Sequence, residues 1–105
     1  MSIGIDLVCI TDFKQHLKKE GIIEKVFTKT ELTIMPNLQE SAGFFAAKEA
    51  FMKALGEKID WLDVWLEILP SGKPVILSPY IPKNQKAEVS ISHDGDYAIA
   101  VVTIA

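Results

Sequence analysis

Charged side chains occur in two stretches of this 105-residue chain that are otherwise largely apolar. Asp6 falls in a stretch with the alternation of a strand. Lys48, Glu49 and Lys53 fall together in a helix-forming stretch. Two carboxylates from different elements can hold a hard cation with water in the remaining positions, which is the usual arrangement for Mg²⁺ on a phosphate substrate. Lysines beside such a metal would neutralise phosphate oxygens.

A further candidate is His93, at the end of a predicted strand and directly before the hairpin signal Asp94-Gly95. Simpler interpretations exist for each charged residue. His93 is equally explained as a histidine beside a turn, and Asp6 as a side chain in water on an edge strand. Glu49 and Lys53 are spaced to form an ion pair one helical turn apart on a wet surface.

The stretch Ser41 to Gly56 is the centre of the predicted fold, a helix of about four turns that ends at a glycine. Its apolar face consists of Phe44, Ala47, Phe51 and Leu55. Lys48 points along that face, where an unpaired charge would be costly. One explanation is that its ammonium reaches the surface while its methylenes stay buried.

The rest of the chain predicts an α+β fold, in which an antiparallel sheet packs against the long central helix and several short helices. The predicted strands cover residues 2–9, 74–77, 88–93 and 97–104, with a loop at 78–86. Short helices are predicted from Thr11 or Asp12 to Glu20, over 22–27, and from a Thr28–Glu31 capping box to Pro36, followed by a connector at 37–40. Residues 59–69 fit either a strand or a helix carrying Trp61 and Trp65.

Composition predicts one domain over residues 1–105, with 49% apolar residues available for its core. No apolar run is long enough to span a membrane, and Cys9, the single cysteine, is in keeping with a cytoplasmic location. A net charge of −3 argues against nucleic-acid binding. Residues 14–29 nevertheless hold five lysines against two glutamates, which indicates an acidic partner or a solvated helix face.

Several motifs occur in a characteristic order along the chain. They are Gly4-Ile5-Asp6-Leu7-Val8, Phe27-Thr28-Lys29-Thr30-Glu31-Leu32, residues 45–56 (FAAKEAFMKALG), Gly72-Lys73-Pro74, and Val89-Ser90-Ile91-Ser92-His93 with Tyr97-Ala98. Together they resemble the holo-acyl-carrier-protein synthases, the small members of the 4′-phosphopantetheinyl transferases. The Phe-Ala-Ala-Lys-Glu-Ala block is the most specific of these motifs.

The resemblance implies transfer of phosphopantetheine from coenzyme A to a serine of an acidic acyl carrier protein, leaving 3′,5′-adenosine bisphosphate. It implies a Mg²⁺-dependent homotrimer with active sites between subunits. Asp6 and Glu49 match the metal ligands, and Glu49 also helps to deprotonate the serine. Lys53 matches a phosphate-contacting lysine and Lys48 falls beside it, while His93 matches a histidine near the coenzyme A site. Lys14, Lys18 and Lys25 are expected to steer the carrier.

The chain departs from the family pattern at three places. Phe44 stands where the family usually has an arginine that serves the nucleotide phosphates. Asp12 replaces an arginine that meets the carrier, and Gly56-Glu57-Lys58 replaces a Gly-Thr-Gly loop. A buried Phe44 is expected, at a cost in coenzyme A affinity. An alternative to the working transferase is therefore a weakened relative that binds coenzyme A or a carrier without efficient transfer.

Overall fold

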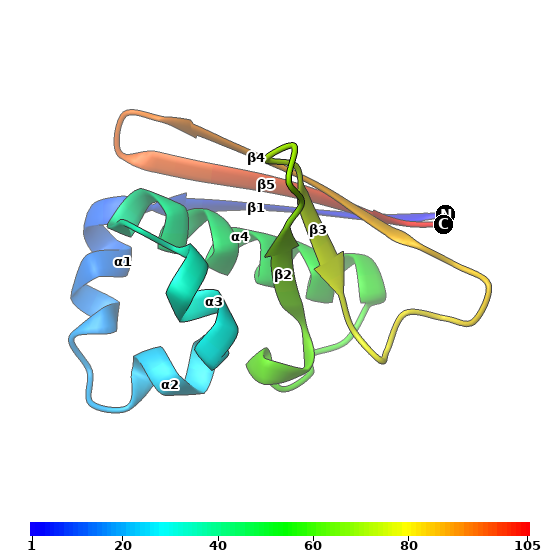
Figure 1. The fold of residues 1–105 in the computed structure, drawn as a ribbon, viewed down its shortest axis with the longest axis horizontal. Helices are drawn as coiled ribbons and strands as arrows, with labels where there is room; N and C mark the ends of the chain where they lie inside the picture. Colours follow the sequence, from blue (N-terminus) through cyan, green and yellow to red (C-terminus); the bar gives the residue numbers. More distant parts are fainter.

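A computed structural model describes all residues, 1–105, and confirms the predicted α+β class. The elements are β1 (Ser2–Cys9), α1 (Ile10–Leu17), α2 (Ile22–Val26), α3 (Lys29–Ile34), α4 (Leu38–Leu55), a 3₁₀ turn (Trp61–Asp63), β2 (Trp65–Ile68), β3 (Pro74–Leu77), β4 (Ala87–Asp94) and β5 (Tyr97–Ile104). Figure 1 shows α4 running along one face of an antiparallel sheet with strand order β1-β5-β4. The β2–β3 hairpin crosses α4, and the two termini lie side by side. No helix is both long and apolar enough to cross a membrane.

Strand β1 turns Gly4, Asp6 and Val8 toward α4, while its other face carries exposed apolar side chains. Gly4 permits this close approach. A Cβ atom at that position would overlap the carbonyl oxygen of Ala50 and lie 2.7 Å from the backbone nitrogen of Ala54. The absence of a side chain at Gly4 therefore brings the strand that carries Asp6 directly against the helix that carries Glu49.

Helix α4 begins at Leu38, three residues before the predicted start at Ser41. The side chain of Asn37 accepts a hydrogen bond from the backbone N–H of Glu40 (2.9 Å) and so caps the helix. The prediction of a connector over residues 37–40 was therefore wrong, because Asn37 supplies an N-cap. The predicted end is confirmed: Gly56 adopts a φ of 86° and donates to the carbonyl of Met52.

Helix α1 was predicted with a cap at Thr11 or Asp12 and an end at Glu20, and both boundaries were wrong. It begins at Ile10, immediately after β1, and ends at Leu17, with no cap from its own N-terminal side chain. Asp96, far along the chain, supplies the acceptors instead. Its backbone carbonyl accepts from the N–H of Ile10 (2.7 Å), and its carboxylate accepts from the N–H of Thr11 (3.2 Å).

The ambiguous stretch over residues 59–69 contains both kinds of structure. A 3₁₀ turn at Trp61–Asp63 is capped by the side chain of Asp60, and the strand β2 follows at Trp65. The ring of Trp61 stacks on that of Phe45 at 5.0 Å, which explains why this tryptophan is partly buried. The predicted capping box of Thr28 and Glu31 is confirmed at the start of α3.

Candidate active site

Asp6 and Glu49 line one open cavity of about 400 Å³, between β1, α1 and α4. The strand and the helix thus bring the two predicted carboxylates to one cavity. Asp12 and His16, one turn apart on α1, line the same cavity. Its apolar wall is formed by Phe13 and Phe45, whose ring centroids lie 5.1 Å apart.

Lys53 forms an ion pair with one of these two carboxylates. Its ammonium donates to the Asp6 carboxylate (3.1 Å) and to the carbonyl of Ile5 (2.9 Å). The Lys53 side chain is 54% exposed, while that of Asp6 is 16% exposed, so the ammonium is available to a ligand in solution. The ion pair that Lys53 forms is with Asp6 on the neighbouring strand, not with Glu49 one turn earlier.

Burial and mutual repulsion act on the two carboxylates. Burial raises the pKa of Asp6, and the contact with Lys53 acts in the opposite direction. Burial also raises the pKa of Glu49, and the negative charge of Asp6 raises it further, against the opposing charges of Lys58 and Lys53. Two carboxylates that resist ionisation in this way would be stabilised by a bound cation.

The donor set fits a magnesium ion in part. No three His, Cys, Asp or Glu side chains converge as a metal-binding group. Mg²⁺ is commonly bound by one or two carboxylates together with water and substrate phosphates. Asp6 and Glu49 are the residues that would hold it.

Lys48 lies in the core and not at the rim of a site. Its side chain is fully buried, and its ammonium is 2.6 Å from the carboxylate of Glu31, which is also fully buried. The same nitrogen donates to the carbonyls of Val26 (2.7 Å) and Trp61 (3.1 Å). All three donors are used, so the ammonium neither extends to the surface nor remains free for a phosphate. The prediction of Lys48 as a coenzyme A contact is inconsistent with this position.

His93 lies apart from the carboxylate pair. It belongs to β4, at the opposite edge of the sheet from β1, and lines a separate cavity of about 220 Å³. Because a carbonyl only accepts, the Nε2 of His93 donates to the carbonyl oxygen of Gln39 (2.9 Å). Within one chain, His93 therefore does not share a site with Asp6 and Glu49.

Phe44 is 2% exposed, which confirms the prediction that it belongs to the core. It reaches the cavity that His93 lines, where Glu40 is the other titratable side chain. No lysine or arginine lines this cavity, so the position of the family's arginine offers no positive charge in this chain.

Two charged residues make contacts that sequence reasoning did not assign to them. Lys58 faces Glu49 from the loop after α4, close enough for its charge to lower the pKa of that glutamate. Glu31 was recognised as part of a capping box, and its carboxylate proves also to be the partner of Lys48. The charged residues of Gly56-Glu57-Lys58 were the available signal for the role of Lys58. Nothing local in the sequence indicated the pairing of Glu31 with Lys48.

A model of the 4′-phosphopantetheinyl transferase superfamily matches residues 2–102. The holo-[acyl-carrier-protein] synthase of Nautilia profundicola is 37% identical over 110 residues, covering 97% of each chain. That of a Geobacillus species is 36% identical over 115 residues, covering 99% of this chain and 95% of the relative.

The solved structures agree with the sequence relatives. The crystal structure of Helicobacter pylori holo-[acyl-carrier-protein] synthase in complex with coenzyme A has a TM-score of 0.90 and 33% identity, covering 98% of this chain and 99% of that one. The family resemblance of the ordered motifs is thereby confirmed. The chain belongs to the 4′-phosphopantetheinyl transferase superfamily, as an enzyme of the holo-[acyl-carrier-protein] synthase class.

Proposed function

We propose that the enzyme transfers 4′-phosphopantetheine from coenzyme A to a serine of an apo acyl carrier protein, with Mg²⁺ held by Asp6 and Glu49, and releases 3′,5′-adenosine bisphosphate. The observation that carries the proposal is the convergence of Asp6 and Glu49 on one cavity, with Lys53 bound to Asp6 at 3.1 Å. Family membership supplies the reaction class, and these three side chains supply the chemistry that such a reaction needs.

In this reaction the serine hydroxyl oxygen attacks the phosphorus that carries the pantetheine arm. The bond from that phosphorus to the bridging oxygen of the diphosphate breaks, and the bridging oxygen leaves on 3′,5′-adenosine bisphosphate. The serine proton passes to Glu49, directly or through water.

Lys53 positions the phosphate and neutralises its charge. Its ammonium lies beside Asp6 and is half exposed, so it can contact a phosphate oxygen without leaving the helix surface. Mg²⁺, when bound, stabilises negative charge on the reacting phosphate. The test of the whole proposal is incubation with coenzyme A, Mg²⁺ and a panel of apo carriers, followed by mass spectrometry for the phosphopantetheine adduct. Absence of the adduct on every carrier, at any enzyme concentration, would contradict it.

A second candidate function is binding of coenzyme A or a carrier with inefficient transfer. The observation in its favour is Phe44, which is buried and leaves its side of the His93 cavity without a cation. A charge-assisted hydrogen bond is worth about 1.5–3 kcal/mol, so coenzyme A binding is expected to be roughly ten- to a hundredfold weaker than in members with arginine there. Calorimetry on coenzyme A and dephospho-coenzyme A tests this: tight binding with a strong preference for coenzyme A would contradict it.

We further propose that the enzyme is a homotrimer, with His93 serving a site completed by another copy. The separation of His93 from Asp6 within one chain supports this arrangement. Trp61 and Trp65 are partly buried within the single chain, which makes them weaker candidates for the interface. A better candidate is the outer face of the sheet, where four apolar side chains are exposed: Ile3, Ile5, Leu7 and Ile99.

Ile5→Asp is expected to shift the enzyme from trimer to monomer, because it places a charge at the middle of this apolar face, where Ile5 is 55% exposed in the single chain. Analytical ultracentrifugation at micromolar concentration measures the shift. Leu69→Asp is the control, since Leu69 is 42% exposed in the turn between β2 and β3. A wild-type protein that sediments as a stable monomer would contradict the proposal.

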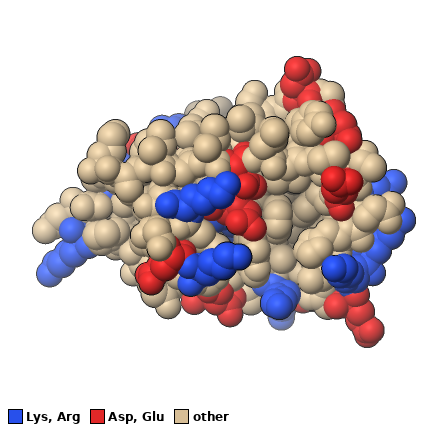
Figure 2. All heavy atoms as spheres, turned by 180° about the vertical axis from the view of Figure 1, so that it is seen from behind, with Lys and Arg blue, Asp and Glu red and all other residues tan.

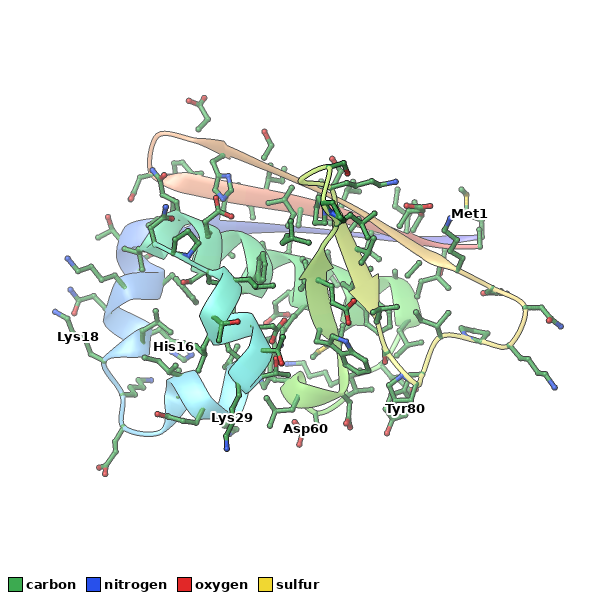
Figure 3. The ribbon with its side chains drawn as sticks, in the orientation of Figure 1. Met1, His16, Lys18, Lys29, Asp60 and Tyr80 are labelled. Carbon is green, nitrogen blue, oxygen red and sulfur yellow. The ribbon has the colours of Figure 1, made fainter.

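The basic stretch is proposed to steer the acidic carrier. Lys14 and Lys18 are exposed, and Figure 3 shows Lys18 at the outer side of α1. Figure 2 shows basic side chains gathered at the edge of the molecule to which α1 and α2 belong. Asp12 is also exposed and lines the cavity, and its negative charge cannot attract an acidic carrier, so attraction rests on the lysines.

The variant Lys14→Glu with Lys18→Glu is expected to lower kcat/KM for the carrier about tenfold at low salt, because electrostatic steering raises association rates by at least that factor. The loss should shrink as salt is raised, since charges are screened beyond about 8 Å at physiological ionic strength. Lys83→Glu, in the loop after β3, is the control. Unchanged kinetics at low salt would show that the lysines are only a solvated face.

A further inference from the structure

Strand β1 runs into helix α1 without a loop, since Cys9 ends the strand and Ile10 begins the helix. The first N–H groups of a helix have no acceptor within the helix itself. Cys9, the N-cap residue, makes no side-chain capping bond, so the acceptors must come from elsewhere. The direction in which α1 leaves the sheet therefore depends on a partner outside this junction.

Asp96 supplies that partner from the turn between β4 and β5. Its backbone carbonyl accepts from the N–H of Ile10 at 2.7 Å, and one carboxylate oxygen accepts from the N–H of Thr11 at 3.2 Å. The other carboxylate oxygen accepts from the thiol of Cys9 at 3.2 Å. All three oxygens of one residue are thus directed at three consecutive residues, which fixes both the position and the orientation of the junction.

The hairpin holds Asp96 against this junction. Asp94 pairs with Tyr97 across the turn, and Tyr97 also pairs with Cys9 on the neighbouring strand. Gly95 adopts a φ of 56°, a conformation that glycine accepts without steric cost. Asp96 therefore precedes a strand, β5, that is itself bonded to β1, so that the acceptor and its donors belong to one hydrogen-bonded sheet edge.

The helix that Asp96 directs forms one wall of the active-site cavity. Four residues of this region line the cavity that contains the carboxylate pair: Cys9, Asp12, Phe13 and His16. Only two of the eight residues of α1, Ile10 and Phe13, are buried. Because so few buried side chains restrain its tilt, the bonds at its first turn decide where this wall of the cavity lies.

We propose that Asp96 is a positioning residue of the transferase, whose acceptor oxygens fix the tilt of α1 and thereby the wall of the cavity beside Asp6 and Glu49. Asp96 does not line the cavity itself and acts through the helix. The inference rests on the proposed function, in which α1 carries lysines that steer the carrier.

The surroundings of Asp96 favour this role over a share in the core or in a charge network. Its side chain is exposed and forms no ion pair, so its carboxylate is not needed to neutralise a neighbouring cation. The hydrogen bonds from Thr11 and Cys9 lower the pKa of this carboxyl, as expected where the ionised form is the acceptor. Asp96 therefore contributes the geometry of the junction.

The carboxylate pair is positioned independently of Asp96. Asp6 is brought against α4 by the close approach at Gly4, and Glu49 belongs to α4. Lys53 donates to Asp6 from the same helix. Loss of the Asp96 carboxylate should therefore displace the α1 wall and leave in place the groups that are proposed to bind Mg²⁺ and the phosphate.

The test is steady-state transfer kinetics of the full chain, with coenzyme A and an apo carrier varied in turn, for wild type, Asp96→Ala and Asp96→Asn. Asp96→Ala should raise KM for the carrier about tenfold, since a misplacement of about 1 Å can cost as much as 10²-fold. KM for coenzyme A should stay unchanged. Asp96→Asn should behave like wild type, because asparagine and aspartate cap helices about equally well.

A control variant and a direct measurement separate positioning from general stability. Asp96→Ala keeps the carbonyl that accepts from Ile10 and loses no buried side chain, so it should remain folded. Thr28→Ala removes a side-chain cap from α3, no residue of which lines the cavity, and should leave both KM values unchanged. Hydrogen exchange of the Thr11 amide, followed by NMR, should be faster in Asp96→Ala and unchanged in Asp96→Asn.

An unchanged KM for the carrier in Asp96→Ala would overturn the proposal, and so would an equal rise in both KM values. If Asp96→Asn were as impaired as Asp96→Ala, the charge of the residue and not its acceptor geometry would be responsible, which also contradicts the proposal. Failure of the underlying function is recognised separately, because in that case wild type itself would form no phosphopantetheine adduct.

Discussion

Glu49→Gln is expected to lower the rate of phosphopantetheine transfer by a factor on the order of 10²–10³, the usual cost of removing one electrostatic contributor to a reacting centre. The amide keeps the shape of the side chain but removes a metal ligand and the proton acceptor together. Glu57→Gln, the same substitution in the loop after α4, is the control and should keep most of the activity. The measurement is the initial rate of adduct formation on an apo carrier at saturating coenzyme A.

The same variant is expected to be more stable than wild type at neutral pH when Mg²⁺ is absent. Because the folded state raises the pKa of Glu49, it binds the proton more tightly than the unfolded state does. The free energy of unfolding therefore falls as the pH rises from the ordinary pKa of glutamate through the raised pKa of Glu49. At neutral pH the ionised glutamate destabilises the fold. Glutamine removes this cost. Below the ordinary pKa of glutamate the advantage should disappear, because both states are then protonated.

Thermal unfolding with and without Mg²⁺ checks this expectation. Mg²⁺ should raise the midpoint of wild type more than that of Glu49→Gln, because the wild-type carboxylates gain a cation. An active Glu49→Gln enzyme, or a variant less stable than wild type in metal-free buffer at neutral pH, would count against the placement of Glu49 at a metal site.

Lys48→Met is expected to lower the free energy of unfolding by about 3–5 kcal/mol, the cost of leaving one member of a buried ion pair without its partner. The carboxylate of Glu31 is fully buried and would lose the ammonium at 2.6 Å. It would retain hydrogen bonds from the backbone N–H groups of Thr28 and Leu66, both at 2.9 Å, which are not enough to compensate a buried negative charge.

Urea-induced unfolding followed by circular dichroism measures the loss, and the same helix offers a matched control. Lys53→Met is the same substitution five residues later, at a side chain that is 54% exposed and paired with Asp6. Exposed ion pairs contribute about 0–1 kcal/mol, so this variant should remain folded while losing transfer activity. Equal destabilisation by the two substitutions would contradict the structural role of Lys48.

Restoring charge balance gives a further check on the same pair. Glu31→Leu with Lys48→Met should recover part of the lost stability, because neither charge is then buried alone. Recovery should be incomplete, since the N–H groups of Thr28 and Leu66 lose their carboxylate acceptor in the double variant. A double variant less stable than Lys48→Met alone would show that the hydrogen bonds of Glu31 outweigh its charge pairing.

Local sequence determined most of the secondary structure, because the decisive interactions there are between neighbours in the chain. The alternation of β1, the apolar spacing of α4 with Gly56 after it, and the hairpin signal before β5 each depend on a few consecutive residues. The turn itself falls on Gly95 and Asp96, one residue later than predicted, because Asp94 pairs with Tyr97 as the last residue of β4. The capping box of Thr28 and Glu31 is local in the same sense. The ordered motifs also identified the family, because a family is recognised from residue types and their order along the chain, without knowledge of how they pack.

Tertiary structure alone decided what the charged residues do. Asp96 fixes the start of α1 across 85 positions of sequence, from its carboxylate to the N–H of Thr11. Whether Lys48 or Lys53 could meet a phosphate depended on which faces of α4 the sheet and α3 cover. The two lysines lie five residues apart in one motif, and nothing in that motif distinguishes them. Lys48 is nevertheless buried in an ion pair with Glu31 of α3, whereas Lys53 is at the surface in an ion pair with Asp6 of β1. Long-range partners of this kind leave no periodic signal in the chain, because the contact is set by packing between elements and not by spacing within one.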